Sequence, residues 1–299
     1  MATLRITGGR SLNGKVKAQG SKNATLPILA ATLLTDQPIE LTNVPKLSDV
    51  ANLSRILTSL GKSVEQASPE SLSIWRDADL VGDVPQELVK RMRASFLILG
   101  PLLARTGRAE VSLPGGDLIG TRPVDLHLEG LKSMGAQIEV LDKGIVRATA
   151  SKLHPVEIRL RFPSVGATEH LMMTAALIPG ITRIHNPAKE PEIADLAHIL
   201  ATMGAKIEIV ESTVIIEGRE ELHGATHHVI PDRLHAGTFM IAAALCGEDV
   251  NIECIPEHVR PLIDALKQIG IAIEEDSDGL VISSSHTKKL RPMAIETGP

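Results

Sequence analysis

Residues 193–210 read IADLAHILATMGAKIEIV, which is an amphipathic run followed by a glycine and an alternating segment. Counting from Ile193, apolar residues recur at i, i+3, i+4 and i+7, as one buried face of a helix requires. Gly204 is suited to the left-handed conformation that commonly ends a helix. In AKIEIV, apolar and charged residues then alternate, as in a strand with one face on a core. The stretch therefore predicts a helix and a strand that share one buried side.

The same unit occurs four times along the chain. Its helix ends at Gly61, Gly135, Gly204 and Gly270, and the prolines that precede it, Pro45, Pro114, Pro187 and Pro256, lie 69, 73 and 69 residues apart. Each copy also contains an earlier run that is apolar nearly all round, at residues 23–34, 93–104, 166–177 and 235–246. An all-round apolar helix is normally buried. We therefore expect each copy to place one helix inside and one amphipathic helix over it.

Strands complete the predicted unit. A strand beginning at Leu12, Leu153 or Leu222 precedes three of the buried helices, and two more strands follow each amphipathic helix. The predicted fold class is α/β, built from repeated βαβαββ units with right-handed connections. Because one such unit cannot close its own core, several must pack their inner helices together. The segment at residues 290–299, LRPMAIETGP, aligns with the opening strands, so we expect a fifth copy to begin there and the chain to be a truncated piece.

Composition excludes several functional classes. Aromatic residues are 1% of the 299 residues and the net charge is −5, which is unfavourable for base stacking or for a general polyanion surface. No run of 18 apolar residues occurs, so we expect no membrane association and a cytoplasmic protein. Cys246 and Cys254 predict neither a disulfide framework nor a metal site, and Cys246 is expected to be buried. We expect no metal and no cofactor.

Function is expected where one copy departs from the others. From the proline to the helix-ending glycine the copies span 16, 21, 17 and 14 residues, so the second is the longest. Its extra residues form a glycine-rich loop at 114–123, which contains Asp117 and Arg122. This composition predicts a lid that covers a substrate. A solvated turn with an incidental aspartate fits the spacing equally well.

Basic residues mark the starts of two predicted inner helices. Lys22 and Asn23 begin the first, and Arg93, preceded by Lys90 and Arg91, begins the second, whereas Ser164 at the third is uncharged. A cation beside a helix N-terminus suits a phosphate, because both favour negative charge. Each basic residue alone is more simply a solvated side chain. Together, at equivalent ends of converging helices, they predict an anionic ligand.

These motifs resemble the UDP-N-acetylglucosamine enolpyruvyl transferases. The resemblance is carried by GSKNATLPILAATLL (20–34), KRMRASFLILGPL (90–102), VSLPGGDLIGTRPVDLHLEGL (111–131), PSVGAT (163–168), EPEIADLA (190–197) and PDRLHAGTF (231–239). It implies an inside-out α/β barrel of six units in two domains, of which four units are present here. It further implies a complete three-unit domain at 22–229 that carries the lid, and an incomplete second domain at 1–21 plus 230–299.

The resemblance also implies an activity, namely transfer of the enolpyruvyl group of phosphoenolpyruvate to the 3-hydroxyl of UDP-N-acetylglucosamine with release of phosphate. Asp117 would donate a proton, and Lys22 with Asn23 would contact phosphoenolpyruvate and the sugar. Arg93 and Arg122 would bind the phosphorylated ligands. The nucleotide site would be lined by Pro123, Val124, Asp125, Leu126, Phe162, Pro163, Ser164 and Val165. No nucleic acid and no obligate protein partner are implied.

Two residues depart from the resemblance. Most members carry cysteine at the position of Asp117, and many carry lysine at that of Phe162. A carboxyl group cannot form the thioether that fosfomycin makes with cysteine, so we expect the complete enzyme to resist it. The implied base lies in a fifth unit, so the 299-residue chain is expected to be nearly inactive. Two alternatives stay open: a shikimate-3-phosphate enolpyruvyl transferase, and a non-catalytic module that binds a UDP-sugar.

Overall fold

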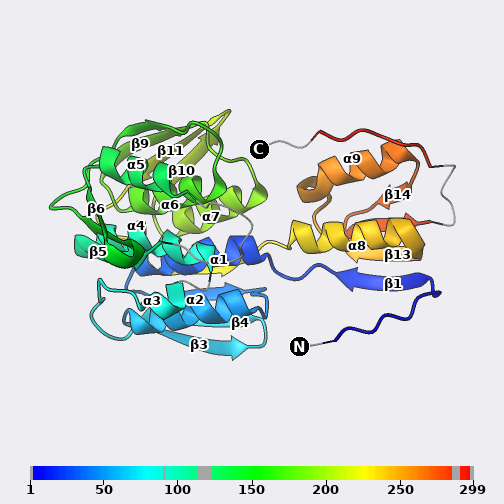
Figure 1. Cartoon of the computed structure of the whole chain (residues 1–299), viewed down its shortest axis with the longest axis horizontal. Helices are drawn as coiled ribbons and strands as arrows, with labels where there is room; N and C mark the ends of the chain where they lie inside the picture. Colours follow the sequence, from blue (N-terminus) through cyan, green and yellow to red (C-terminus); the bar gives the residue numbers. More distant parts are fainter. Residues whose placement is uncertain (1–2, 90–91, 114–122, 285–289, 297–299) are drawn as a thin grey trace. The chain divides into compact units, whose positions relative to one another are not determined.

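The computed structural model describes residues 3–89, 92–113, 123–284 and 290–296 (Figure 1). The chain separates into two compact units. The larger unit is Ser21–Ile230, and the smaller unit joins Met1–Gly20 to Pro231–Gly298. Each has an apolar core of its own. Within the described residues, no helix is both long and apolar enough to cross a membrane.

The described part of the larger unit contains three sheets, one from each of the first three copies. The first has the order β12 (Ala225–His228), β2 (Ile39–Thr42), β4 (Ser71–Arg76) and β3 (Lys62–Ser68). The second is β5 (Arg108–Ser112), β7 (Ile145–Thr149) and β6 (Gln137–Leu141). The third is β10 (Lys206–Val210), β11 (Thr213–Gly218), β9 (Gly180–His185) and β8 (Glu157–Arg159).

Inside these sheets lie the apolar helices of the three copies. They are α1 (Lys22–Ala31) with η1 (Thr32–Leu34), η2 (Arg93–Ile98) with α4 (Leu99–Thr106), and α6 (Val165–Ala176). These three contact one another, and the amphipathic helices α2 (Ser48–Ser59), α5 (Asp125–Ser133) and α7 (Pro191–Thr202) pack against them. In α1 every residue from the third to the last is buried, and the same holds for α6. The predicted burial of these inner helices is therefore confirmed. The short helices α3 (Gln86–Val89) and η3 (Asp142–Gly144) lie in connections.

Two helical glycines allow α4 and α5 to approach α6 closely. A Cβ atom on Gly130 of α5 would lie 2.4 Å from Leu171 Cδ2 of α6. A Cβ atom on Gly100 of α4 would lie 2.1 Å from Thr174 Oγ1 and 2.6 Å from His170 Nε2. Contacts this short cannot exist, so a larger residue at either position would force the helices apart.

The smaller unit contains one copy of the repeat. Its sheet has the order β1 (Leu12–Lys17), β13 (Gly247–Glu253), β15 (Gly279–Ser283) and β14 (Ala272–Glu275). The helices are α8 (Arg233–Cys246), η4 (Pro256–Val259) and α9 (Arg260–Ile269). The prediction that the inner helix is buried all round is wrong for α8, because Leu245 is 78% exposed and Cys246 is also exposed. Within the described part of the smaller unit no second inner helix packs against α8, so only one face is covered.

Two opening strands are exchanged between copies. The order in the sequence predicts that the strand at Leu12 opens the first copy and the strand at Leu222 opens the fourth. Instead β1 pairs in parallel with β13, and β12 pairs in parallel with β2. In the third copy β8 pairs with β9 as predicted. The chain passes from one unit to the other twice, at Gly20–Ser21 and at Ile230–Pro231. These two connecting segments are hydrogen-bonded to each other, because the Ser21 N–H donates to Ile230 O and the Asp232 N–H donates to Gln19 O, each at 2.8 Å.

One hydrogen bond recurs in all four copies and confirms the repeat. The carbonyl of the residue before each helix-ending glycine accepts from an N–H at the start of the next segment. The four bonds are Val81 N to Leu60 O, His154 N to Met134 O, His223 N to Met203 O, and Arg291 N to Ile269 O, at 3.2, 3.0, 2.9 and 3.0 Å. The last one supports the alignment of residues 290–296 with the opening strands, although no strand forms there. In the second copy the opening strand is reduced to the bridge between Asp83 and Glu110.

Candidate anion-binding site

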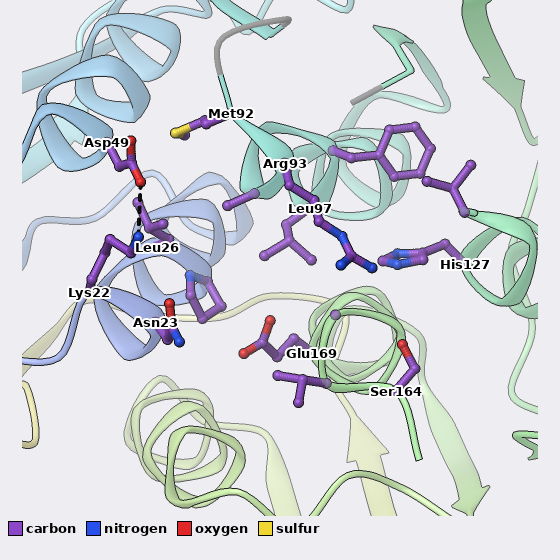
Figure 2. Close-up of a pocket in the computed structure, with 16 residues that line it drawn as sticks. Lys22, Asn23, Leu26, Asp49, Met92, Arg93, Leu97, His127, Ser164 and Glu169 are labelled. Atoms are coloured by element: carbon purple, nitrogen blue, oxygen red, sulfur yellow. Dashed lines mark ion pairs between the residues drawn. The ribbon is translucent and has the colours of Figure 1, made fainter. Parts of the chain in front are cut away.

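A cavity of about 480 Å³ lies within the larger unit, where the first turns of α1, η2, α5 and α6 meet (Figure 2). Its walls combine basic, acidic and apolar side chains. It is lined by Lys22, Asn23, Leu26, Pro27, Asp49, Met92, Arg93, Ala94, Phe96, Leu97, Val124, His127, Ser164, Val165, Gly166 and Glu169. A concave site of this size can enclose a small ligand.

A repeated capping motif brings two of these helices into the site in the same way. Ser21 Oγ accepts from the Ala24 N–H at 3.2 Å, and Ser164 Oγ accepts from the Ala167 N–H at 3.4 Å. Each cap leaves other N–H groups of its first helical turn without an intrahelical acceptor. The positive ends of both helix dipoles therefore favour negative charge at the cavity.

Two cationic side chains add to this field. The Nζ atom of Lys22 lies 3.3 Å from Oδ2 of Asp49, which is in the first turn of α2. Arg93 is exposed, and its guanidinium extends toward His127 (Figure 2). Among the described residues, Arg93 forms no salt bridge. A guanidinium with no carboxylate partner in a concave site is suited to a carboxylate or phosphate ligand.

His127 lines the cavity, and His170 lies behind it, with their Nδ1 atoms 2.9 Å apart. Burial lowers the pKa of His127 to about 4, with the Arg93 charge acting in the same direction. Burial, and then the neighbouring His127, lower the pKa of His170 well below its usual value. Both rings are therefore uncharged at neutral pH and act through hydrogen bonds rather than through charge.

The carboxyl group of Glu169, on α6, also lines the cavity. The residue is 4% exposed, and its Oε1 atom has no hydrogen-bond partner. Burial raises the pKa of Glu169 well above its usual range, and the nearby Glu192 and Glu190 raise it further. These effects favour the protonated acid, which leaves the positive field of Lys22 and Arg93 intact.

The structure brings together about half of the residues proposed from the sequence. Lys22, Asn23, Arg93, Val124, Ser164 and Val165 line the cavity. Five others lie outside its lining, namely Pro123, Asp125, Leu126, Phe162 and Pro163. Asp125 forms a salt bridge with Arg161, Leu126 is in the core, and Phe162 is 46% exposed. Asp117 and Arg122, with Lys90 and Arg91, lie outside the described residues.

Sequence reasoning missed three polar residues of the lining. Asp49 and His127 occur in amphipathic helices, where polar residues are expected, so neither gave a signal. Glu169 did give one, because a carboxylate inside an all-round apolar helix is rarely buried without a reason. In the described residues, no group of three or more His, Cys, Asp or Glu side chains could hold a metal ion.

The fold is an α/β protein of repeated βαβαββ units, with two cationic side chains and the N-termini of several helices at one cavity. Comparison with known families identifies it further. Residues 6–299 match the family of EPSP synthase (3-phosphoshikimate 1-carboxyvinyltransferase). The chain belongs to this family of enolpyruvyl transferases.

Curated relatives are similar along the whole chain. A protein of Caulobacter sp. (strain K31), named UDP-N-acetylglucosamine 1-carboxyvinyltransferase, is 46% identical over 305 residues, which cover 100% of this chain and 70% of the relative. UDP-N-acetylglucosamine 1-carboxyvinyltransferase 2 of Carboxydothermus hydrogenoformans is 47% identical over 301 residues, covering 100% of this chain and 71% of the relative. The resemblance seen in the sequence motifs is thereby confirmed.

Solved structures give the same fold. The enolpyruvyl transferase NikO from Streptomyces tendae superposes with a TM-score of 0.84 at 25% identity, covering 93% of this chain and 67% of that one. An EPSP synthase from Acinetobacter baumannii superposes with a TM-score of 0.74 at 18% identity, covering 97% of this chain and 68% of that one. The predicted enolpyruvyl transferase fold is confirmed.

Proposed function

We propose that this chain serves the UDP-N-acetylglucosamine 1-carboxyvinyltransferase reaction. Phosphoenolpyruvate would give its enolpyruvyl group to the 3-hydroxyl of UDP-N-acetylglucosamine, and phosphate would be released. The observation that carries the proposal is the 46–47% identity to relatives of that name, which extends over the whole chain. This reaction begins peptidoglycan synthesis, so we also propose a cytoplasmic role in cell-wall formation.

The cavity supports a substrate that carries negative charge. Lys22 and Arg93 both line it, and Ser164, Val165 and Gly166 at the N-terminus of α6 form another part of its wall. Phosphoenolpyruvate carries a phosphate and a carboxylate, and the nucleotide sugar carries a diphosphate. Such donors hold an anion in place while charge moves during the reaction.

The proposed chemistry is an addition followed by an elimination. A proton adds to the methylene carbon of phosphoenolpyruvate while the sugar hydroxyl attacks the neighbouring carbon and loses its own proton. Loss of a proton from the new methyl group then expels phosphate and restores the double bond. We propose Asp117 as the group that delivers the first proton, because a carboxyl group with a raised pKa can act as a general acid.

Shikimate 3-phosphate is the alternative acceptor, since the family model is described by that reaction. The EPSP synthase structure shares the fold at 18% identity, whereas the UDP-N-acetylglucosamine enzymes are 46–47% identical. The acceptor is therefore proposed to be the nucleotide sugar. The stretch GGDLIGTRPVDLH (115–127) also resembles the UDP-sugar enzymes more than the shikimate-phosphate enzymes.

The test is calorimetric titration of the chain with each acceptor. UDP-N-acetylglucosamine should bind, and shikimate 3-phosphate at the same concentration should not. Arg93→Gln should weaken binding by about 10- to 100-fold, as expected for loss of one charge-assisted hydrogen bond. Lys132→Ala is the matched control, because Lys132 is an exposed cation on α5 away from the cavity.

Two results would contradict the proposal. Tighter binding of shikimate 3-phosphate would assign the chain to the alternative reaction. Equal losses in Arg93→Gln and Lys132→Ala would show that the cavity is not where the ligand binds.

A further inference from the structure

A chain of hydrogen bonds crosses the interior from α4 to the cavity. The Gly100 N–H donates to His170 Nε2 at 2.6 Å, and His170 Nδ1 lies 2.9 Å from His127 Nδ1. Gly100 belongs to α4, His170 to α6 and His127 to α5, so the chain joins three helices of the larger unit. His170 itself does not line the cavity, whereas His127 does.

The backbone determines the direction of every bond in this chain. An amide nitrogen can only donate, so His170 Nε2 must accept from Gly100. A neutral imidazole has one N–H, which His170 must then carry on Nδ1. That N–H donates to His127 Nδ1, and the remaining proton of His127 must be on Nε2. The tautomers of both rings follow from one backbone N–H.

The Nε2 atom of His127 faces the start of α6. A Cβ atom added to Gly166 would lie 3.4 Å from it, and Gly166 lines the cavity. Among the described residues, Nε2 of His127 makes no hydrogen bond. The neighbouring Arg93 guanidinium can only donate as well. Two donors therefore converge on one wall, where an anionic oxygen could accept from both.

We propose that His170 is a positioning residue, which holds His127 as an Nε2–H donor for a carboxylate or phosphate oxygen of the bound ligand. The inference rests on the proposed function for the identity of that ligand, but the tautomers can be tested without it. His170 acts through His127 and does not touch the ligand. A position that is only buried would be filled equally well by an apolar residue. His170 instead has an imidazole whose two nitrogens both form hydrogen bonds, to the Gly100 N–H and to His127 Nδ1.

The arrangement of the charges around His127 supports its role as a neutral Nε2–H donor. The groups that face His127 are His170 from α6, Arg93 from η2 and Asp125 on its own helix. Burial, and then the cation at Arg93, oppose protonation of His127, so the ring stays neutral and keeps Nδ1 as an acceptor. A neutral donor also avoids placing a buried positive charge beside the cation of Arg93.

The first measurement is of the tautomers, by long-range ¹H–¹⁵N NMR of the chain labelled in histidine. His170 should be protonated on Nδ1 and His127 on Nε2. The result for His170 is diagnostic, because a free neutral imidazole prefers its proton on Nε2. Addition of UDP-N-acetylglucosamine should then shift the Nε2–H resonance of His127.

The second measurement compares His170→Asn with His170→Leu. Both variants lose the ring and leave the Gly100 N–H without its acceptor, but only asparagine retains an N–H that can donate to His127 Nδ1. His170→Leu should weaken ligand binding by about 10-fold, as for loss of a positioned hydrogen bond, and His170→Asn should restore most of it. Thermal denaturation of both variants shows whether they are folded.

Either measurement can overturn the inference. A proton on Nε2 of His170 contradicts the direction of the chain, whatever ligand binds. Equal ligand affinities for folded His170→Asn and His170→Leu show that His170 only fills space. If His170→Leu does not fold, the tautomers of the unmodified chain decide the matter. Failure of the unmodified chain to bind the nucleotide sugar, with the expected tautomers present, refutes the proposed function instead.

Discussion

Helices α1 and α8 come from similar sequence but have different surroundings. Both are apolar nearly all round and begin at a side-chain cap, Ser21 for α1 and Asp232 for α8. In the larger unit α1 contacts η2 and α6 and is buried on every side. In the smaller unit α8 is buried only at four positions, and Leu234, Ile241 and Leu245 are exposed. Burial of an inner helix is thus a property of several assembled copies.

The comparison also shows where the candidate site comes from. The cavity of the larger unit lies where the starts of three inner helices meet, and each copy contributes a different side chain. The first supplies Lys22, the second Arg93 and the third the Ser164 cap with Glu169. One copy offers a single helix N-terminus. The features shared by the copies therefore form the core, and the side chains that differ between the copies determine the chemical character of the cavity.

The sharpest test replaces a leucine at the same distance from each cap. Leu34 follows α1 and is fully buried, whereas Leu245 is 78% exposed on α8. Leu34→Ala should lower the free energy of unfolding of the larger unit by about 2–5 kcal/mol, through lost burial and a cavity. Leu245→Ala should change stability by no more than about 0.5 kcal/mol. Urea denaturation measures both.

Trp75 makes the measurement on Leu34→Ala specific to the larger unit. It is the single tryptophan of the chain and lies on β4 of the larger unit, so its fluorescence reports that unit. Far-UV circular dichroism reports both units together. Equal losses of stability for the two leucine variants would show that α8 is covered as well as α1.

Acid should destabilise the larger unit first. The pKa of His127 falls from 6.5 when exposed to about 4 in the fold, so its stabilising contribution is complete above pH 6.5 and is lost as the pH falls toward 4. This shift corresponds to at most about 3 kcal/mol. In the smaller unit, Arg260 and then Lys267 lower the pKa of Glu275 to about 2, so its contribution is lost only between pH 4.5 and 2.

Glu169 has the opposite pH dependence and must be removed before the histidine effect is measured. In the Glu169→Gln background, stability followed by Trp75 should fall between pH 6.5 and 4.5. Adding His127→Asn should reduce that slope and leave the part due to His170, whose pKa burial also lowers. His154→Asn, which removes an exposed histidine, should not reduce it. A slope that is unchanged by the loss of His127 would mean that other groups bind the protons.

Local patterns predicted the helices and their order, but not the pairing of distant segments. Gly204 and the period of the preceding residues identify a helix end within a single window of sequence. Exchange of β1 and β12 leaves no such local trace, because β1 pairs with residues more than two hundred positions away and β12 with residues more than one hundred and eighty positions away. The contact between His127 and His170 spans 43 residues and two helices, so no local signal could reveal it.

Glu169→Gln tests what full burial does to a carboxyl group on α6, an inner helix of the larger unit. The raised pKa of Glu169 means that its contribution to stability is complete below pH 4.5 and is lost as the pH rises through its value in the fold. The variant should therefore be more stable than the parent at pH 8 and similar to it at pH 4.5, as urea denaturation at the two pH values would show. Glu296→Gln, an exposed change, is the control for charge alone.

The caps at the two helix starts give the smallest effect. Ser21 Oγ accepts one N–H, from Ala24 at 3.2 Å, whereas Asp232 Oδ1 accepts two, from Leu234 at 2.8 Å and from His235 at 3.1 Å. A charged cap also interacts favourably with the helix dipole. Asp232→Ala should therefore cost about 1–2 kcal/mol and Ser21→Ala about 0.5–1 kcal/mol.

Exchanging the caps separates the side chain from its surroundings. Asp232→Ser should retain part of the stability that Asp232→Ala loses, because serine can still accept one N–H of α8. Amide hydrogen exchange in the first turns of α1 and α8 follows each helix start separately. Ser21→Ala could destabilise the start of α1 more than Asp232→Ala destabilises the start of α8. That result would mean that burial by neighbouring helices, rather than the chemistry of the cap, determines how much each helix start depends on its cap. The difference between α1 and α8 would then extend from their exposed faces to their ends.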